Sequence, residues 1–214
     1  MRFALVHSPF TGPDIWEPVA TQLRGRGHEV VVPDLADDGA PPYWRAHAES
    51  AAAQIGLEPA VLVLHSNAGL LAAEIGSRTP VAGYVFVDAL LPRGGRRMSD
   101  EFEQAIGPLL ANGGRWPDWT DEALEDAVPN TDRRRRLVAG LRPRAADFYE
   151  EQLPEPPRSW PDAPAAYLLL QREPYGELAA TAAERGWRVR GLEAAHFHML
   201  VEPDKVAEAI LELV

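Results

Sequence analysis

The hexapeptide at residues 64–69, Leu-His-Ser-Asn-Ala-Gly, contains the side chain best suited to nucleophilic chemistry. This side chain, Ser66, comes shortly after the apolar run Val61–Leu64, which we predict to be a buried strand, and shortly before a helical pattern over 69–77. A serine on such a sharp strand-to-helix turn holds its hydroxyl above the sheet, and the small residues Ala68 and Gly69 allow close packing there. The helix N-terminus directs backbone N–H groups to the point where negative charge develops in acyl transfer.

A purely structural interpretation of Ser66 is also open at this point. Serine is a preferred N-cap residue, so its hydroxyl could serve only to begin the helix. The motif also has Leu64 where nucleophile turns of this type usually have glycine.

The elements that must position this serine alternate between strands and helices. Short apolar runs predict strands at 3–6, 29–32, 61–64, 83–87, 165–170 and 187–192. Spacings of three and four predict helices at 16–24, 43–55, 69–77, 177–185 and 204–213. This order is typical of βαβ units, so we predict an α/β fold with a mainly parallel sheet flanked by helices.

The composition changes between residues 92 and 164, where Arg, Asp, Glu, Pro and Trp are frequent. Short helices are predicted there at 99–110, 121–127, 133–141 and 145–152. We therefore expect one domain over residues 1–214, with a core of 1–91 and 165–214 and a helical lid at 92–164.

The order of motifs resembles the α/β-hydrolase superfamily over nearly the whole chain outside the 92–164 insertion. The resemblance is carried by six segments in order: His-Ser-Pro-Phe-Thr-Gly-Pro at 7–13, Trp16, Gly27–Leu35, His65–Gly69, Phe86–Ala89 and Ala195–Phe197. It implies a sheet of about six parallel strands, with a nucleophile elbow and a catalytic triad at the carboxyl ends of the strands, under the lid.

The resemblance implies that His196 is the general base for Ser66, with His198 as the alternative. It places the acid after the penultimate strand, where Glu173 precedes Pro174. Two other carboxylates remain candidates. Asp88 ends the fourth strand, where some lipases of this fold carry their acid, and Glu177 follows Glu173.

The resemblance also implies an oxyanion hole and a pocket. The Asn67 N–H would be one donor, and the second normally comes from the position of Pro9, which has no N–H, so Phe10 is expected to replace it. The expected lining of the substrate pocket comprises His7, Pro9, Trp16, His65, Trp116, Trp119 and Phe197. Aromatic residues in a lid suit an apolar substrate, although several must simply pack the lid onto the core.

The run Arg133–Arg136, with Arg142 and Arg144, is unusual in a chain whose net charge is −11. One interpretation is a solvated helix face paired with nearby carboxylates. The other is a docking patch for a substrate bound to a carrier, either coenzyme A or an acyl carrier protein.

Composition excludes several other classes of function. The negative net charge disfavours nucleic-acid binding, and no apolar run approaches the roughly 20 residues of a membrane span. The chain has no cysteine, and its six histidines show no metal-ligand spacing, so we expect a cytoplasmic protein with no metal and no cofactor.

The sequence therefore predicts a serine hydrolase, an esterase or thioesterase, acting on a small to medium apolar acyl group. Two alternatives remain on the same fold, which hosts many chemistries. One is a lyase, cyclase or acyl-transfer tailoring enzyme of secondary metabolism, and the other is an inactive ligand-binding protein.

Overall fold

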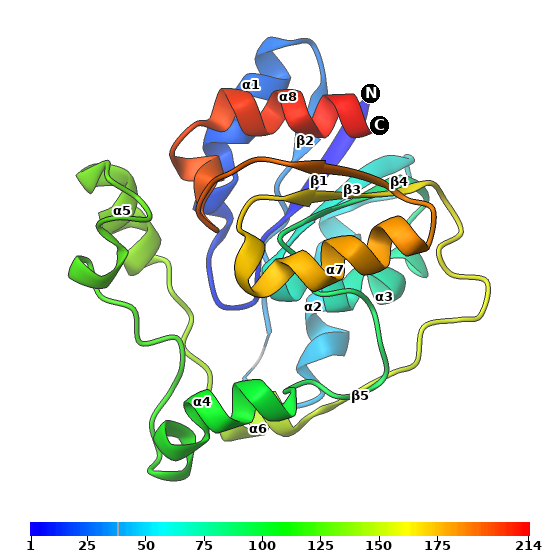
Figure 1. The fold of residues 1–214 in the computed structure, drawn as a ribbon. Coiled ribbons are helices and arrows are strands. Elements are labelled where there is room, and N and C mark those ends of the chain that lie inside the picture. Colours follow the sequence, from blue (N-terminus) through cyan, green and yellow to red (C-terminus); the bar gives the residue numbers. More distant parts are fainter. Residues whose placement is uncertain (38) are drawn as a thin grey trace.

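The computed structural model describes residues 1–37 and 39–214, and its centre is a six-stranded parallel sheet (Figure 1). The strands lie in the order β2-β1-β3-β4-β7-β8. Their bounds are Glu29–Val31 (β2), Arg2–Val6 (β1), Ala60–His65 (β3), Val81–Val87 (β4), Ala165–Leu169 (β7) and Arg188–Gly191 (β8). This confirms the predicted α/β class and the predicted six-stranded parallel sheet.

Helices cover both faces of the sheet, which is why its central strands β3 and β4 are almost entirely apolar, with His65 at the end of β3 as the exception. Figure 1 shows α1 and α8 on one side, and α2, α3 and α7 on the other. Their bounds are Glu17–Gly25 (α1), Pro203–Leu213 (α8), Tyr43–Ile55 (α2), Ala72–Gly76 (α3) and Arg172–Glu184 (α7). Successive strand residues divide between two cores: Phe3 and Leu5 pack under α1 and α8, while Ala4 and Val6 pack on the opposite face.

The segment 92–164 contains short elements joined by irregular chain. They are β5 (Gly95–Arg96), α4 (Asp100–Ala111), the 3₁₀ helix η3 (Glu122–Leu124), α5 (Thr131–Ala139), α6 (Ala146–Glu150) and β6 (Gln152–Leu153). The predicted helix at 121–127 is reduced to η3, and the antiparallel pair β5–β6 was not predicted. The segment has an apolar cluster of its own, in which Phe148 and Tyr149 of α6 pack against Phe10 and Tyr43 of the body. Its role as a lid stays a prediction.

Two sharp turns at the carboxyl ends of the strands use left-handed backbone at residues other than glycine. Ser66, after β3, has a φ of 57°, and Asp88, after β4, has a φ of 41°. Such conformations cost of order 1–3 kcal/mol each and persist where surrounding contacts hold them. The two turns are joined directly, because the Leu90 N–H donates to the Ser66 carbonyl at 3.0 Å.

Gly69 is required where these two turns approach each other. A Cβ at this position would lie 1.9 Å from the carbonyl oxygen of Leu90, far inside contact distance. Leu90 is held by its N–H bond to the Ser66 carbonyl, and Gly69 by its own carbonyl, which accepts from the Ala72 N–H, so neither residue can move aside cheaply. The predicted need for a small residue after Ser66 therefore has a specific cause, which is the chain that follows β4.

We expect Gly69→Ala to destabilise the protein by at least about 1–3 kcal/mol, the cost of overpacking a rigid site. Gly25→Ala is the matched control, since a Cβ there meets nothing within 4 Å. Urea unfolding followed by circular dichroism measures both variants. Equal midpoints for Gly69→Ala and the wild type would contradict the packing argument.

Candidate active site

Ser66 is held at the carboxyl end of β3 as the first residue of the 3₁₀ helix η2 (Ser66–Leu71). The residue at the N-cap position is His65, and no side chain caps this helix. The structural interpretation of Ser66 as a cap is therefore not supported. The Ser66 side chain instead lines a cavity. Leu64, at the position usual for glycine, is fully buried in the core.

The carboxylate that contacts His196 is Asp88. Its Oδ2 lies 3.2 Å from His196 Nδ1, and the Asp88 side chain is fully buried. The first-choice acid, Glu173, is exposed, and its contact in this region is a backbone one, since its carbonyl accepts from the Gln171 side chain at 2.6 Å. Glu177 is exposed at the cavity rim. Of the three candidate carboxylates, the structure therefore brings the alternative, Asp88 at the end of β4, to His196 in place of the first choice, Glu173.

The Asp88 carboxylate also binds the chain that follows β7. Its Oδ1 accepts from the Leu170 N–H at 2.6 Å, and its Oδ2 accepts from the Gln171 N–H at 3.0 Å. The Gln171 side chain then accepts from the backbone N–H of His196 at 3.1 Å. The ends of β4 and β7 and the loop after β8 are therefore fixed by one hydrogen-bonded group.

Burial shifts both pKa values in this pair. It raises the pKa of Asp88 to about 6, against the opposing effect of the Leu170 N–H hydrogen bond. It lowers the pKa of His196 to about 3. At neutral pH His196 is neutral and Asp88 is ionised, so Nδ1 carries the hydrogen and Nε2 has the lone pair that a general base needs.

Two rings frame the imidazole of His196. The His65 ring lies 4.3 Å away between centroids, and its Nε2 donates to the His196 carbonyl at 3.1 Å. The Tyr175 ring stacks on the His196 imidazole, with 4.8 Å between centroids and 4° between planes. The Tyr175 hydroxyl lies 3.4 Å from His196 Nε2. Burial raises the pKa of this hydroxyl, and a hydrogen bond with the Ser66 side chain partly opposes that shift.

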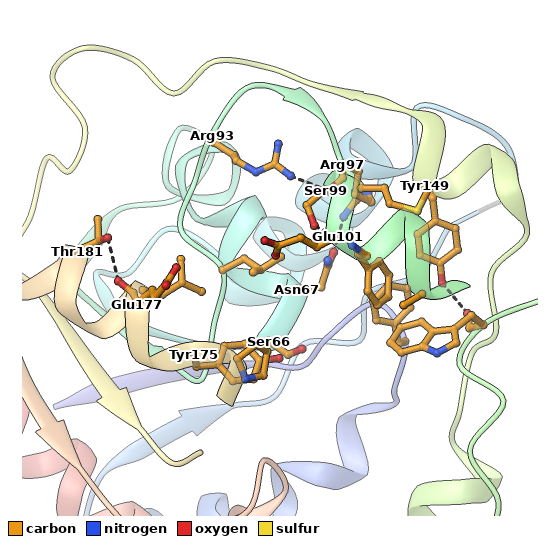
Figure 2. Close-up of a pocket in the computed structure, with 18 residues that line it drawn as sticks. Ser66, Asn67, Arg93, Arg97, Ser99, Glu101, Tyr149, Tyr175, Glu177 and Thr181 are labelled. Carbon is orange, nitrogen blue, oxygen red and sulfur yellow. Dashed lines mark hydrogen bonds between the residues drawn. The ribbon is translucent and has the colours of Figure 1, made fainter. Parts of the chain in front are cut away.

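Tyr175 is a site residue that the sequence interpretation missed. Figure 2 shows its side chain beside Ser66 at one end of the cavity. In the part of the chain that the structure describes, Ser66 Oγ and His196 Nε2 form no direct hydrogen bond. Catalytic hydrogen bonds are often long in the absence of substrate and shorten when it binds. The only sequence signal for Tyr175 was its place after Glu173-Pro174, which we interpreted as a turn.

The expected oxyanion hole is only half present. Asn67 is the second residue of η2, so its N–H has no partner within that helix. Pro9 has no N–H, as the sequence indicates. The Phe10 N–H, expected to replace it, points to Ser8 Oγ within its own loop at 3.4 Å. Phe10 contributes its ring to the cavity wall instead.

The cavity beside Ser66 has a volume of about 550 Å³ (Figure 2). Its wall is largely apolar and its polar groups are few and distinct, as in many small-molecule sites. The lining residues are Phe10, Ser66, Asn67, Leu90, Arg93, Arg97, Met98, Ser99, Glu101, Phe102, Ala105, Trp116, Tyr149, Pro174, Tyr175, Glu177, Leu178 and Thr181. One of the seven residues expected to line the substrate pocket, Trp116, is in this lining.

The other six expected lining residues lie outside this cavity wall: His7, Pro9, Trp16, His65, Trp119 and Phe197. They pack under or around the site. His7 accepts from the Leu35 N–H at Nε2 and donates from Nδ1 to the Ser8 carbonyl at 2.8 Å, which fixes the first loop. Trp16 packs edge-on against His65.

Most of the unusual arginines are used inside the molecule. Arg133 donates to the Leu200 carbonyl at 2.6 Å, and the buried Arg134 pairs with Asp121 at 3.0 Å. Arg142 and Arg144 pair with carboxylates of the 34–37 loop. These contacts favour a structural role for this arginine group, and docking of a carrier-bound substrate stays a prediction.

Neither a metal site nor a membrane span is found in residues 1–37 and 39–214. Groups of three or more His, Asp or Glu side chains that could hold a metal ion do not occur in these ranges. None of the helices described there combines the length and apolar character needed to cross a bilayer.

Comparisons with known proteins agree with the arrangement of the strands. A model of the alpha/beta hydrolase family matches residues 3–209. No curated protein sequence matches significantly. An extracellular alpha/beta-hydrolase from a Paenibacillus species, described as similar to a tobacco salicylic acid binding protein, superposes with a TM-score of 0.75 at 20% identity, covering 100% of this chain and 98% of that one.

Two further solved structures show the same fold. Polyneuridine aldehyde esterase has a TM-score of 0.71 at 20% identity, covering 99% of this chain and 98% of its own. Tomato methylketone synthase I complexed with 2-tridecanone has a TM-score of 0.70 at 18% identity, covering 99% and 96%. Identities this low show a shared fold and do not transfer an activity.

The identity of the acid can be tested by comparing two variants. We expect Asp88→Asn to lower the rate at which a fluorophosphonate labels Ser66 by about 10⁴-fold, because an amide holds the wrong imidazole tautomer. Glu173→Gln is the matched control and should label at the wild-type rate, since Glu173 is exposed. Mass spectrometry of the Ser66 peptide measures both rates. A large loss in Glu173→Gln with none in Asp88→Asn would restore the original assignment.

The pKa of Asp88 predicts an acid limb for the same reaction. Above a pH of about 6 its carboxylate is ionised and accepts from His196 Nδ1, and below that pH it is neutral. The labelling rate should therefore fall as the pH decreases through about 6. The residual labelling rate of Asp88→Asn should not fall in this pH range. This variant is the control for any pH dependence of the probe's own reactivity. A limb that persists unchanged in Asp88→Asn would exclude Asp88 as its source.

Proposed function

The chain belongs to the alpha/beta hydrolase family, and from this premise we propose that it is a serine hydrolase, an esterase or thioesterase. The proposal rests mainly on one observation. A fully buried carboxylate, Asp88, contacts His196 Nδ1 at 3.2 Å at the end of the sheet where Ser66 is held with left-handed backbone. Structural helix caps and surface ion pairs do not need such an arrangement.

The proposed reaction begins with attack of Ser66 Oγ on the carbonyl carbon of a bound ester. The Ser66 side chain turns towards His196, and Nε2 takes the hydroxyl proton as the new C–O bond forms. Asp88 keeps the ring in place and stabilises the imidazolium through Nδ1. The bond from the acyl carbon to the leaving oxygen or sulfur then breaks, and His196 gives its proton to that leaving group. A water molecule, deprotonated by His196, attacks the acyl-enzyme, the bond to Ser66 Oγ breaks, and Ser66 regains its proton.

The cavity supports a substrate with a small to medium apolar acyl group. Its apolar wall includes Met98, Phe102, Trp116 and Tyr149, and its volume of about 550 Å³ lies within the range of small-molecule sites. Among the proteins of the same fold, one is named as a pyrethroid hydrolase and another as polyneuridine aldehyde esterase, so ester hydrolysis has precedent on this scaffold.

One observation favours the non-hydrolytic alternative. Pro9 removes an oxyanion donor, and the loss of one such donor typically reduces ester cleavage by about 10²–10³-fold. A lyase or cyclase on this fold would depend less on that donor. Tomato methylketone synthase I has the same fold, so this scaffold also occurs in a protein that is named as a synthase rather than as a hydrolase.

The proposed function predicts a covalent reaction at Ser66. We expect a fluorophosphonate to label wild-type Ser66, and p-nitrophenyl acetate and butyrate to be hydrolysed with an initial burst of one p-nitrophenol per chain. Ser66→Ala should lose both properties. Ser99→Ala is the control, because Ser99 also lines the cavity but caps α4.

The outcomes separate the alternatives. Folded wild-type protein that neither labels nor hydrolyses any ester would overturn the hydrolase proposal. Labelling without turnover of the ester panel would instead favour the non-hydrolytic enzyme.

A further inference from the structure

The side chain of Asn67 has a fixed orientation beside the nucleophile. Its Oδ1 lies 2.6 Å from Nη1 of Arg97 (Figure 2). A guanidinium carries only donors, so the amide atom that faces it must be the oxygen. The amide nitrogen Nδ2, with its two hydrogens, consequently points away from Arg97.

Arg97 is itself immobilised. Its Nε donates to Glu151 Oε1 at 2.8 Å, its Nη2 bonds the same oxygen, and both side chains are almost fully buried. The guanidinium lies 4.3 Å from the centroid of the Phe148 ring. Glu151 Oε2 accepts from the Trp44 N–H at 3.3 Å, so the carboxylate is satisfied as well. The pairing of β5 with β6 brings these two residues together.

The Nδ2 of Asn67 opens to the cavity. Within the described residues it has no hydrogen-bond partner, and it is not sealed from solvent, while Asn67 lines the cavity beside Ser66. A rigid donor that the protein does not use is suited to an acceptor atom on a bound molecule. The closest reacting centre is the acyl carbon that Ser66 attacks.

The oxyanion hole lacks a donor at this same place. Pro9 has no N–H, and the Phe10 N–H is directed to Ser8 Oγ. The Asn67 N–H alone would leave an oxyanion with one hydrogen bond, although hydrolases of this type usually supply two.

We propose that the side-chain amide of Asn67 supplies the second oxyanion donor, and that Arg97, held by Glu151, is the positioning residue that aims it. The inference rests on the proposed hydrolase function. The ligand group is the oxygen of the reacting ester carbonyl, which gains negative charge as Ser66 adds to the carbon. The Asn67 main chain and side chain then donate to the same atom.

Two variants of Asn67 remove the donor in different ways. Asn67→Leu keeps the approximate volume and has no polar atom, whereas Asn67→Asp keeps an oxygen for Arg97 and lacks the amide hydrogens. We expect each to lower kcat for p-nitrophenyl butyrate by about 10²–10³-fold, with KM changed little. Urea unfolding checks that the variants are folded, and Asn67→Asp keeps the test available if Asn67→Leu is not.

Arg97 is tested together with its partner, so that no buried charge is left alone. The double variant Arg97→Gln with Glu151→Gln frees the Asn67 amide to rotate and should lower kcat less than Asn67→Leu does. Combined with Asn67→Leu, the double variant should cause no further loss in kcat, because the two changes act on the same donor.

A thionoester provides a readout that a structural role would not change. Sulfur in place of the carbonyl oxygen is a poor hydrogen-bond acceptor, so the wild type should strongly prefer the oxygen ester. This preference in kcat/KM should shrink in Asn67→Leu. A lower kcat with an unchanged oxygen-to-sulfur preference would overturn the inference, as would an unchanged kcat in an active, folded variant. Wild-type protein that is not labelled at Ser66 would instead overturn the proposed function itself.

Discussion

The structure depends on how a single buried carboxylate is satisfied. The Asp88 side chain is fully buried, and burying an unpaired charge would cost too much free energy for the fold to be stable. The Leu170 and Gln171 N–H groups and His196 Nδ1 supply its hydrogen bonds. Because these three donors come from two segments far apart in sequence, satisfying one charge also fixes the loop after β7 against the loop after β8. The imidazole is oriented by the same contacts that make the fold self-consistent.

The same burial shifts the pKa values of His196 and Asp88 and makes the ionised carboxylate costly in free energy. Burial lowers the pKa of His196, so its imidazole is neutral at neutral pH, and raises the pKa of Asp88, so its ionised carboxylate is destabilised. Left-handed backbone at Ser66 and Asp88 adds strain to the same small region. The six-stranded sheet must therefore hold this region, and the Leu90 N–H bond to the Ser66 carbonyl links the two strained turns so that neither can relax alone.

The sequence carries much of this information, but unevenly. Apolar runs such as Val61–Leu64 predicted the strands because both faces of the sheet are covered, and Gly69 marked the close turn. The acid could not be chosen in the same way. Asp88 directly follows one predicted strand and Glu173 lies three residues after another. What separates them is the direction of their side chains, which depends on the left-handed turn at Asp88 and on two N–H groups from the chain after β7. Tyr175 lay in a turn with no periodicity.

If the acid is Asp88, as proposed, its place at the end of β4 changes what the end of β7 can do. A carboxylate there would have to reach His196 itself, which would fix the local chain for that purpose. With the proposed acid at Asp88, Gln171 is free to accept from the His196 N–H and Tyr175 is free to stack on the imidazole at the cavity wall. The segment after β7 thus contributes to shaping the cavity and covering the base. The carboxylate that contacts His196 and the residues that line the cavity after β7 therefore come from two different parts of the sheet edge, the end of β4 and the start of α7.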